Sequence, residues 1–302
     1  MNQQFLTELK AVTAENRIFT DEPMKKHTTF RVGGPADILV QPKGTELAAV
    51  IRLCRKYDVP YQVIGNGSNL LVGDRGIRGL VIEMLSKEDE ICVEDDCITV
   101  GAGMLLSKTA NRAAEHGLTG MEFAAGIPGS IGGAVVMNAG AYGGEMKDIL
   151  TAVTVLDQEG NEKILSAEEL ELGYRTSCIL KKGYIVTGAK IKLKHGEETA
   201  IRARMEELKK QRVEKQPLEY PSAGSTFKRP EGYFAGKLIQ ESGLQGFQVG
   251  GAQVSEKHCG FVINKDQATA ADVRTLMQNV ADIVEEKFGV RLEPEVKMIG
   301  EF

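Results

Sequence analysis

The chain has 302 residues, of which 42% are apolar and 26% charged, with 34 glycines, five cysteines and no tryptophan. This composition excludes disorder and collagen-like structure, and the length favours two domains with sizeable buried cores. A formal net charge of −5 argues against a broad nucleic-acid footprint, because binding to phosphates needs clustered cations. No apolar run approaches the roughly 20 residues that span a bilayer, and the N-terminus lacks the pattern of a signal peptide. Since no CxxC pair occurs, we expect free thiols in a reducing cytosol.

Hydrophobic periodicity predicts the elements of the first half. A short amphipathic helix opens the chain, and an extended run follows at 36–40. A helix over 45–57 and a strand over 61–65 complete a strand–helix–strand unit, for which we expect a parallel pair with a right-handed crossover. Next we expect three short strands, at 79–84, 91–95 and 97–103. A weakly amphipathic helix follows, with its apolar positions at 105–113 and its end at Gly117.

The second half is also mixed in character. A hairpin is expected over 151–166, turning at Glu159-Gly160, before a strand and a charged surface helix. The strongest helical periodicity of the chain lies at 273–284, and the last ten or so residues are predicted to be extended. The strand is expected at 184–194 and the surface helix at 198–213. The extended segment is expected at 291–300. Pro217 and Pro221 mark the region of the domain boundary.

The loop Gly65-Asn66-Gly67-Ser68-Asn69 directly follows a predicted strand. Successive backbone N–H groups in such a tight turn can bind an anion. The loop is neither a nucleotide P-loop, because no GxxxxGK[ST] occurs, nor a Rossmann fingerprint, because Leu70 stands where the third glycine belongs. Taken alone, it is more often a plain turn.

A second glycine-rich element, GIPGSIGG, occupies 126–133 within a segment of small residues. Gly129, Gly132 and Gly133 would let the backbone press against a flat or extended ligand, and Ser130 adds a hydroxyl donor. Close packing of strand or helix is an equally good explanation of this element alone. The two elements together suggest a dinucleotide held mainly by main-chain groups.

Seven segments resemble, in order, the UDP-N-acetylenolpyruvoylglucosamine reductase family: KHTTFRVGGPAD (26–37), IGNGSNLLV (64–72), AGIPGSIGGAVVMNAGAYGGE (125–145), GYRTS (173–177), SAGSTFKRP (222–230), GAQVSEKHCGFVIN (251–264) and LEPEVKMIG (292–300). The resemblance implies an α+β protein. A FAD-binding domain of the vanillyl-alcohol oxidase type would cover 1–196, in two α/β subdomains of about 1–83 and 84–196. A smaller α/β substrate domain would cover 197–302. The chain resembles the shorter form of the family, without the insertion that carries a mobile tyrosine.

The resemblance also implies an activity. FAD, bound without a covalent bond, would be reduced by NADPH and would reduce UDP-N-acetylglucosamine enolpyruvate to UDP-N-acetylmuramate, a cytoplasmic step of peptidoglycan precursor synthesis. Two rivals are another FAD-dependent sugar or lactone oxidase of this fold and an electron-transfer flavoprotein subunit. A third is a sugar-nucleotide sensor without turnover.

Site residues are carried over from the matched motifs. The implied FAD-binding residues are Gly65, Asn66, Gly67, Ser68, Asn69, Gly126, Pro128, Gly129, Ser130, Gly132, Gly133, Asn138, Gly140 and Ala141. The implied catalytic residues are Arg175, Ser225 and Glu295, and the implied substrate-binding residues are Tyr174, Lys215 and Arg229. Arg229 stands where other members have an asparagine, which is a departure from the family pattern.

Chemistry gives these catalytic roles independent support. A hydride added to the terminal carbon of an enolpyruvyl ether leaves an enolate-like charge, which needs a cation and a proton. Arg175 can supply a permanently charged fork, and Ser225 can supply the proton if its position is right. Glu295 would help if protonated or if it orients the arginine. Outside their motifs, all three would more often be surface or turn residues.

The histidines indicate no metal site. His116, His195 and His258 lack the spacing of metal ligands, and no HExxH or calcium loop occurs. His27 lies outside the glycine-rich elements, so we expect a structural or hydrogen-bonding role and not a covalent bond to flavin. A requirement for a monovalent ion is left open.

Overall fold

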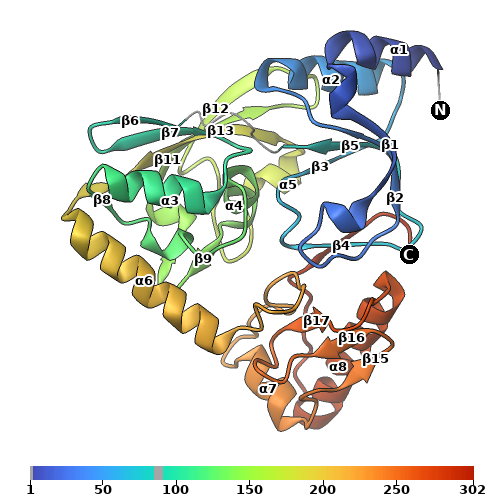
Figure 1. Ribbon diagram of the computed structural model, residues 1–302, viewed down its shortest axis with the longest axis vertical. Coiled ribbons are helices and arrows are strands. Elements are labelled where there is room, and N and C mark those ends of the chain that lie inside the picture. Colours follow the sequence, from blue (N-terminus) through green and yellow to red (C-terminus); the bar gives the residue numbers. More distant parts are fainter. Residues whose placement is uncertain (1–2, 85–90) are drawn as a thin grey trace. The chain divides into compact units, whose positions relative to one another are not determined.

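The computed structural model describes residues 3–84 and 91–302, and the chain forms two compact units (Figure 1). Unit 1 consists of Met1–Phe19, Leu39–Asn66 and Gly79–Arg212, and unit 2 of Thr20–Ile38, Gly67–Arg78 and Val213–Phe302. Unit 2 therefore includes two N-terminal segments in addition to the C-terminal third. The functional boundary that the sequence predicts at 196 stays a prediction.

A four-stranded sheet, with the order β1-β2-β5-β3, contains the first strand–helix–strand unit. Its strands and accompanying helices are α1 (Gln3–Val12), β1 (Ile18–Pro23), β2 (Pro35–Val40), α2 (Gly44–Lys56), β3 (Tyr61–Ile64) and β5 (Ile77–Glu83). Strand β1 is not among the predicted elements. The other elements are as predicted, but the direct pairing of β2 with β3 is wrong. Strand β5 lies between β2 and β3 and pairs with β3 in parallel. All residues of β5 except Arg78 are buried, and a strand buried on both faces is most stable inside a sheet.

Unit 1 contains a five-stranded antiparallel sheet with the order β12-β11-β13-β7-β6. Its strands are β6 (Ile91–Glu94), β7 (Cys97–Gly101), β11 (Leu150–Leu156), β12 (Glu162–Ser166) and β13 (Ile185–Lys192). The predicted hairpin is confirmed, since Leu156 pairs with Glu162 across its turn. Helices α3 (Leu106–Glu115) and α4 (Ile131–Met137) pack against β6, β7 and β13, and the apolar residues between them form the core of this unit.

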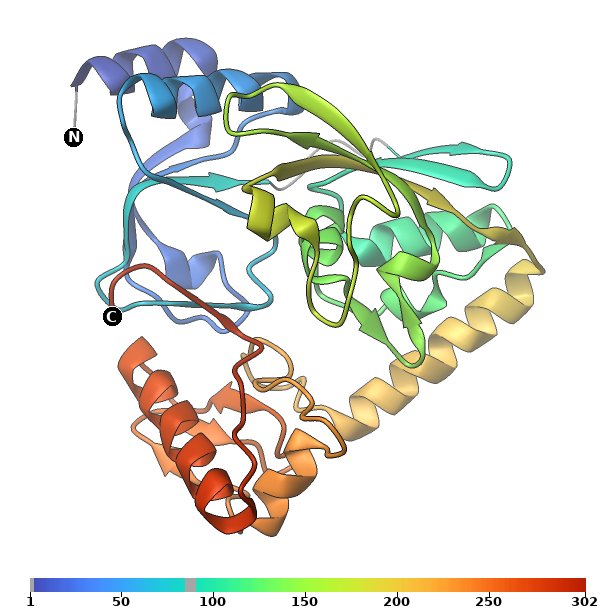
Figure 2. The same cartoon turned by 180° about the vertical axis from the view of Figure 1, so that it is seen from behind.

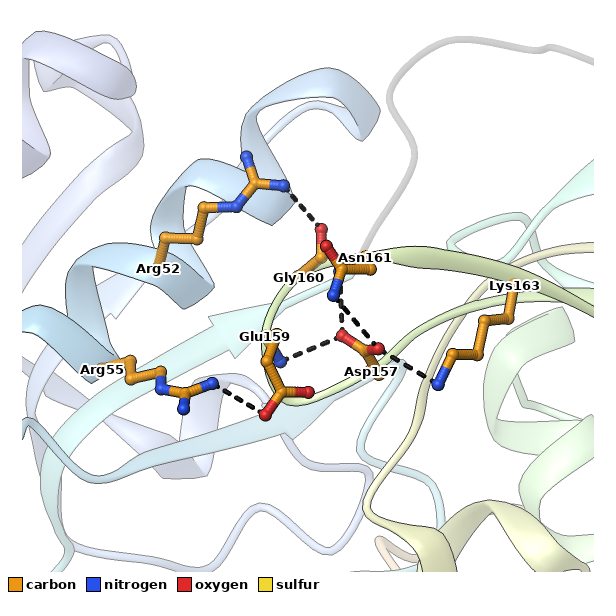
Figure 3. Close-up of polar contacts among 7 residues, drawn as sticks. All are labelled: Arg52, Arg55, Asp157, Glu159, Gly160, Asn161 and Lys163. Carbon is orange, nitrogen blue, oxygen red and sulfur yellow. Dashed lines mark hydrogen bonds and ion pairs between the residues drawn. The ribbon is translucent and has the colours of Figure 1, made fainter.

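The turn of the β11–β12 hairpin is attached to α2 within unit 1 (Figure 3). Arg52 donates to the Gly160 carbonyl at 2.9 Å, and Arg55 lies 2.8 Å from the Glu159 carboxylate. Inside the turn, the Asp157 carboxylate accepts hydrogen bonds from the N–H groups of residues 161 and 159, at 2.9 and 3.0 Å. The pKa of Asp157 is lowered to about 2, first by the bond from the residue 161 N–H and then by the Lys163 ammonium, with a smaller share from the residue 159 N–H. This turn is therefore stabilised by a side chain.

The segment 124–144 contains a helix, α4, that the sequence analysis did not predict. The Ser130 hydroxyl caps it by accepting from the Gly133 N–H at 3.3 Å, and Asn138 ends it in the left-handed conformation, with φ of 42°. A short hairpin follows, formed by β9 (Gly140–Ala141) and β10 (Gly144–Glu145). Glycine-rich sequence disfavours a helix, so packing of its buried residues stabilises α4.

Unit 2 is built around a three-stranded antiparallel sheet, β15 (Gln248–Val249), β16 (Ala252–Val254) and β17 (Val262–Asn264). Helix α8 (Ala270–Phe288), drawn in red in Figure 2, packs against all three strands and confirms the strongest predicted helix. The Asp74 carboxylate accepts from the first two N–H groups of α8, at 2.7 and 2.9 Å. The extended C-terminal segment forms β18 (Lys297–Ile299), which pairs in parallel with β4 (Leu70–Val72).

Helix α6 (Glu198–Lys215) confirms the predicted surface helix, since only Ile201 and Leu208 are buried along it. Within the described ranges, no helix is long and apolar enough to cross a membrane. The remaining elements are α5 (Cys178–Lys182), α7 (Ala235–Glu241), β8 (Leu118–Thr119), β14 (Lys194–His195) and the short 3-10 helices Glu15–Arg17, Met24–Lys26, Glu122–Ala124 and Met146–Asp148.

Candidate functional site

Within unit 1, the first two residues of the loop 65–69 lie against the second glycine-rich element. The Asn66 side chain donates to the Pro128 carbonyl at 2.7 Å. A Cβ added to Gly65 would stand 2.2 Å from the Ser130 hydroxyl oxygen, so no larger residue fits there without a shift. The structure thus brings together two sequence segments that lie about 60 residues apart in the chain.

The loop 65–69 keeps its main-chain donors available. In the part of the chain that the structure describes, none of the five backbone N–H groups of this loop donates to another group of the protein. Gly67 has φ of 60°, and a Cβ there would lie 2.0 Å from the His27 carbonyl oxygen, which explains the glycine without a ligand. Adjacent unpaired N–H groups are what an anion such as the FAD diphosphate requires. The loop therefore fits this cofactor.

The segment 126–133 has an inner and an outer side. On the inner side, Ile131 and Gly132 donate from their backbones to the carbonyls of Met104 and Ala102, both at 2.8 Å. A Cβ on Gly132 would lie 3.0 Å from the Cβ of Ala102, so this glycine allows close packing. On the outer side, Gly126, Pro128 and Gly133 are exposed and Gly129 is half-buried. The structure thus supports both explanations of the element, packing on one side and an open main-chain surface on the other.

Asn138, Gly140 and Ala141 follow α4, and they connect it to the β9–β10 hairpin. The Asn138 side chain is fully buried, and both N–H bonds of its amide are used within the protein. Gly140 packs closely on Glu145, since a Cβ added to Gly140 would lie only 2.7 Å from the Cβ of Glu145. Ala141 is half-buried on the same hairpin. Contact of these residues with FAD stays a prediction.

Arg175 lies at the tip of a tight turn in unit 1. Gly173 and Thr176 exchange two backbone hydrogen bonds, of 3.1 and 3.3 Å, so Tyr174 and Arg175 protrude between them. Arg175 has φ of 54°, a strained conformation for a residue with a side chain. Its guanidinium donates to the Gly140 carbonyl at 3.4 Å and lies 5.3 Å from the ring of Tyr174. The turn joins one predicted catalytic residue to the predicted FAD-binding segment.

Sequence analysis did not select Arg212, which lies near this region of unit 1. Its guanidinium lies 5.9 Å from the ring of Tyr142, and a Cβ on Gly126 would be 2.9 Å from its Nε. Desolvation by burial lowers the pKa of Arg212 below its ordinary value. A cavity of about 470 Å³ adjoins these groups, lined by residues of α6 and by Asn111, Phe123 and Tyr142. Nothing in the sequence separates Arg212 from the other charges of α6.

Ser225 and Glu295 lie on two paired segments of unit 2. The Glu295 N–H donates to the Thr226 carbonyl at 2.8 Å, and Asn69 donates from its side chain to the Glu295 carbonyl at 3.2 Å. Thr226 is buried, and its hydroxyl accepts from the Val262 N–H at 2.8 Å. Ser225 itself is exposed and Glu295 half-buried. The structure therefore makes these two predicted catalytic residues neighbours.

The predicted substrate-binding residues have different surroundings. Tyr174 is 55% exposed in unit 1. Lys215, the last residue of α6, and Arg229 are exposed in unit 2. The Arg229 guanidinium lies 3.9 Å from the ring of Phe234, and its Nε donates to the Tyr233 carbonyl at 3.3 Å. His27 forms the hydrogen bond expected of it, with a ring nitrogen 3.2 Å from the Glu22 carboxylate.

Comparison with known families agrees with an FAD-binding role for the region that contains the loop 65–69. Residues 36–166 match the family described as an FAD binding domain. Residues 216–299 match the family described as UDP-N-acetylenolpyruvoylglucosamine reductase, C-terminal domain. A flavin-binding domain followed by a second, specialised domain defines the class of this protein as an FAD-dependent oxidoreductase.

Similar proteins identify the family. The chain is 56% identical to the UDP-N-acetylenolpyruvoylglucosamine reductase of Agathobacter rectalis over 314 residues, which cover 100% of both chains. It is 54% identical to that of Clostridium perfringens over 303 residues, 99% of each. The crystal structure of the reductase from Thermus caldophilus matches with a TM-score of 0.78 at 41% identity, covering 91% of this chain and 97% of that one.

The chain therefore belongs to the UDP-N-acetylenolpyruvoylglucosamine reductase family and acts in peptidoglycan precursor synthesis. The predicted fold, a FAD-binding domain and a C-terminal domain of mixed α and β structure, is confirmed. Across residues 3–84 and 91–302, no three His, Cys, Asp or Glu side chains gather as metal ligands would.

Proposed function

We propose that this chain catalyses the NADPH-dependent reduction of UDP-N-acetylglucosamine enolpyruvate to UDP-N-acetylmuramate in the cytoplasm. FAD, when bound, accepts a hydride from NADPH and delivers it to the enolpyruvyl group. One observation supports this proposal more than any other. The loop 65–69 has available N–H groups, and its residues Gly65 and Asn66 contact the segment 126–133, which exposes Gly126 and Gly133; this suits a dinucleotide bound by main chain.

Binding of FAD is assigned to this glycine surface. The N–H groups of 65–69 would bind the diphosphate, and the outer side of Gly126, Pro128, Gly129 and Gly133 would contact the ring and its chain. Ser130 and Gly132 face the protein interior, so they would not contact FAD but would hold the backbone of this segment in place. The Ser130 hydroxyl caps α4, and Gly132 packs closely against Ala102.

Reduction of the enolpyruvyl double bond adds one hydride and one proton to the substrate. The hydride leaves negative charge on the neighbouring carbon and its carboxylate, and Arg175 would stabilise this charge with a guanidinium that never loses its proton. Ser225 would then donate the proton to that carbon from its hydroxyl. Glu295, on the segment paired with that of Ser225, would orient these groups or assist the proton transfer.

Exposed cations of unit 2 suit the rest of the substrate. Lys215 would bind the diphosphate of the sugar nucleotide. Tyr174, in unit 1, would also contact the substrate. Arg229 already contacts Phe234 and Tyr233, so we assign it a weaker share in binding. We further propose that the chain is the short form of the family and that its substrate domain begins near residue 197.

An anaerobic stopped-flow experiment tests the proposal. The purified holoenzyme is first reduced with NADPH while the flavin band is recorded, and UDP-N-acetylglucosamine enolpyruvate is then added. Rapid return of the oxidised flavin band, with one UDP-N-acetylmuramate formed per flavin, is the expected result. Flavin that stays reduced with the substrate but reoxidises quickly in air would instead indicate an oxidase. Reduction without any acceptor reaction would indicate an electron-transfer subunit.

A further inference from the structure

The side chain of Asn138 has no donor left for a ligand. Its Nδ2 donates to the Glu145 carboxylate at 2.7 Å and to the Gly173 carbonyl at 3.1 Å, while its Oδ1 accepts from the Lys147 N–H at 2.9 Å. Two acceptors meet the nitrogen and a donor meets the oxygen, so these partners define the orientation of the amide. The residue is fully buried. An asparagine that serves a ligand directly would point an amide hydrogen toward it.

One of these bonds reaches the turn that carries Arg175. Gly173 is the first residue of this turn, and its carbonyl also accepts from the Thr176 N–H at 3.3 Å. On the other side of the turn, the buried Ser177 hydroxyl donates to the Val136 carbonyl at 2.8 Å. Two side-chain hydrogen bonds therefore attach both ends of the turn to the C-terminal end of α4.

The attachment matters because the turn is strained. Arg175 has φ of 54°, a conformation that an unattached loop would leave for a more favourable one. Its guanidinium donates to the Gly140 carbonyl, only two residues after Asn138. The same short segment thus holds the backbone below Arg175 and contacts its charged group.

We propose that Asn138 is the positioning residue for Arg175, acting through Gly173 and not through contact with the flavin. The inference rests on the proposed role of Arg175 in stabilising charge on the substrate. An arginine whose backbone relaxes by about 1 Å loses much of its effect on the transition state, since such displacements cost up to about 100-fold in rate.

Asn138→Asp tests the proposal at constant side-chain size. The introduced carboxyl group carries at most one proton, which the neighbouring Glu145 carboxylate would share, so none is left for the Gly173 carbonyl and the turn is released. We expect reoxidation of reduced flavin by the enolpyruvyl substrate to slow about 10- to 100-fold. FAD content and the rate of reduction by NADPH should stay within about twofold of wild type. Asn161→Asp, which places the same charge change in the remote β11–β12 turn, is the matched control and should alter neither step.

A double-mutant comparison separates positioning from general damage. In an Arg175→Ala background, Asn138→Asp should slow reoxidation by less than about twofold more, because the group that it positions is already absent. An equal loss in both backgrounds, or loss of FAD from the single variant, would overturn the proposal. Ser177→Ala releases the other end of the turn and serves if Asn138→Asp does not fold. It should reproduce the selective slowing at about 3- to 10-fold, and a normal rate would count against the inference. If the wild-type protein itself does not react with the enolpyruvyl substrate, the proposed function fails instead.

Discussion

The predicted catalytic groups are held in two different ways. In unit 1, Arg175 lies on a strained turn whose two ends are hydrogen-bonded to α4 through the side chains of Asn138 and Ser177. In unit 2, Ser225 precedes Thr226, whose backbone forms two hydrogen bonds with other main-chain groups. The Thr226 N–H donates to the Gly260 carbonyl, and the Thr226 carbonyl accepts from the Glu295 N–H. A group held by main chain tolerates changes in nearby side chains, whereas a group held by side chains does not. We therefore expect the position of Arg175 to be the more sensitive of the two to substitution nearby.

The largest effect is expected from Ser225→Ala. Loss of a positioned proton donor costs about 10²–10⁴ in rate, and only the step that protonates substrate carbon needs this donor. Reduction of FAD by NADPH should stay close to normal, while reoxidation by the enolpyruvyl substrate collapses. Stopped-flow absorbance measures both steps on one sample. Equal slowing of the two steps would mean that Ser225 has a binding or structural role. The segment held by main-chain hydrogen bonds would then carry no proton donor.

Arg175 gives the next largest effect and separates charge from strain. Both Arg175→Ala and Arg175→Gly should slow reoxidation by about 10²–10³, because either change removes the cation. Only glycine accepts φ of 54° without strain, so the melting temperature of Arg175→Gly should exceed that of Arg175→Ala, by the equivalent of about 1 kcal/mol. Steady-state rates and thermal melts provide the test. Equal melting temperatures would show that the turn is not strained, and loss of FAD would show that the arginine is misassigned.

Thr226→Val probes the main-chain-held segment. The change leaves the Val262 N–H buried without an acceptor, which costs about 1–3 kcal/mol of stability. Because the backbone pairing of Thr226 with Glu295 remains, the rate of the folded protein should fall less than about threefold. Thr187→Val, which removes only a donor to the Thr154 carbonyl, is the control and should destabilise less. A large loss of rate at unchanged stability would contradict the view that main-chain bonds suffice to hold Ser225.

The smallest effect concerns Asp157, whose carboxylate accepts its backbone hydrogen bonds from within the β11–β12 turn. The folded-state pKa of about 2 lies below the unfolded value of about 4, so its contribution to stability is present above pH 4 and is lost as pH falls toward 2. We expect Asp157→Asn to lower the melting temperature at pH 7 and to differ less from wild type at pH 3. Activity at pH 7 should not change. A difference in melting temperature that is independent of pH would show that the charge of Asp157 does not stabilise the turn.

Much of this protein follows from its sequence alone. Hydrophobic periodicity sufficed for α2 and α8 and for the β11–β12 hairpin, because amphipathic spacing is a local property of the chain. For α6 the signal was its dense charge with a narrow apolar stripe. The matched motifs sufficed to identify the family, since seven segments in the same order rarely match an unrelated family by chance. The loop 65–69 is an anion-binding candidate because a tight turn after a strand can present successive backbone N–H groups. Taken alone it is more often a plain turn, and only the second glycine-rich element and the matched motifs favour the binding role.

Other features depend on contacts between segments far apart in the chain. The insertion of β5 between β2 and β3 follows from burial on both faces, which no local pattern reports. Helix α4 forms against its glycine content because tertiary packing outweighs propensity. The bonds of Asn138 to Gly173 and Glu145 arise only when α4, the β9–β10 hairpin and the Arg175 turn have folded together. The sequence thus determined which residues are candidates for catalysis. Only the tertiary structure decided which side chains position these residues, because the hydrogen bonds that do so join residues far apart in the chain.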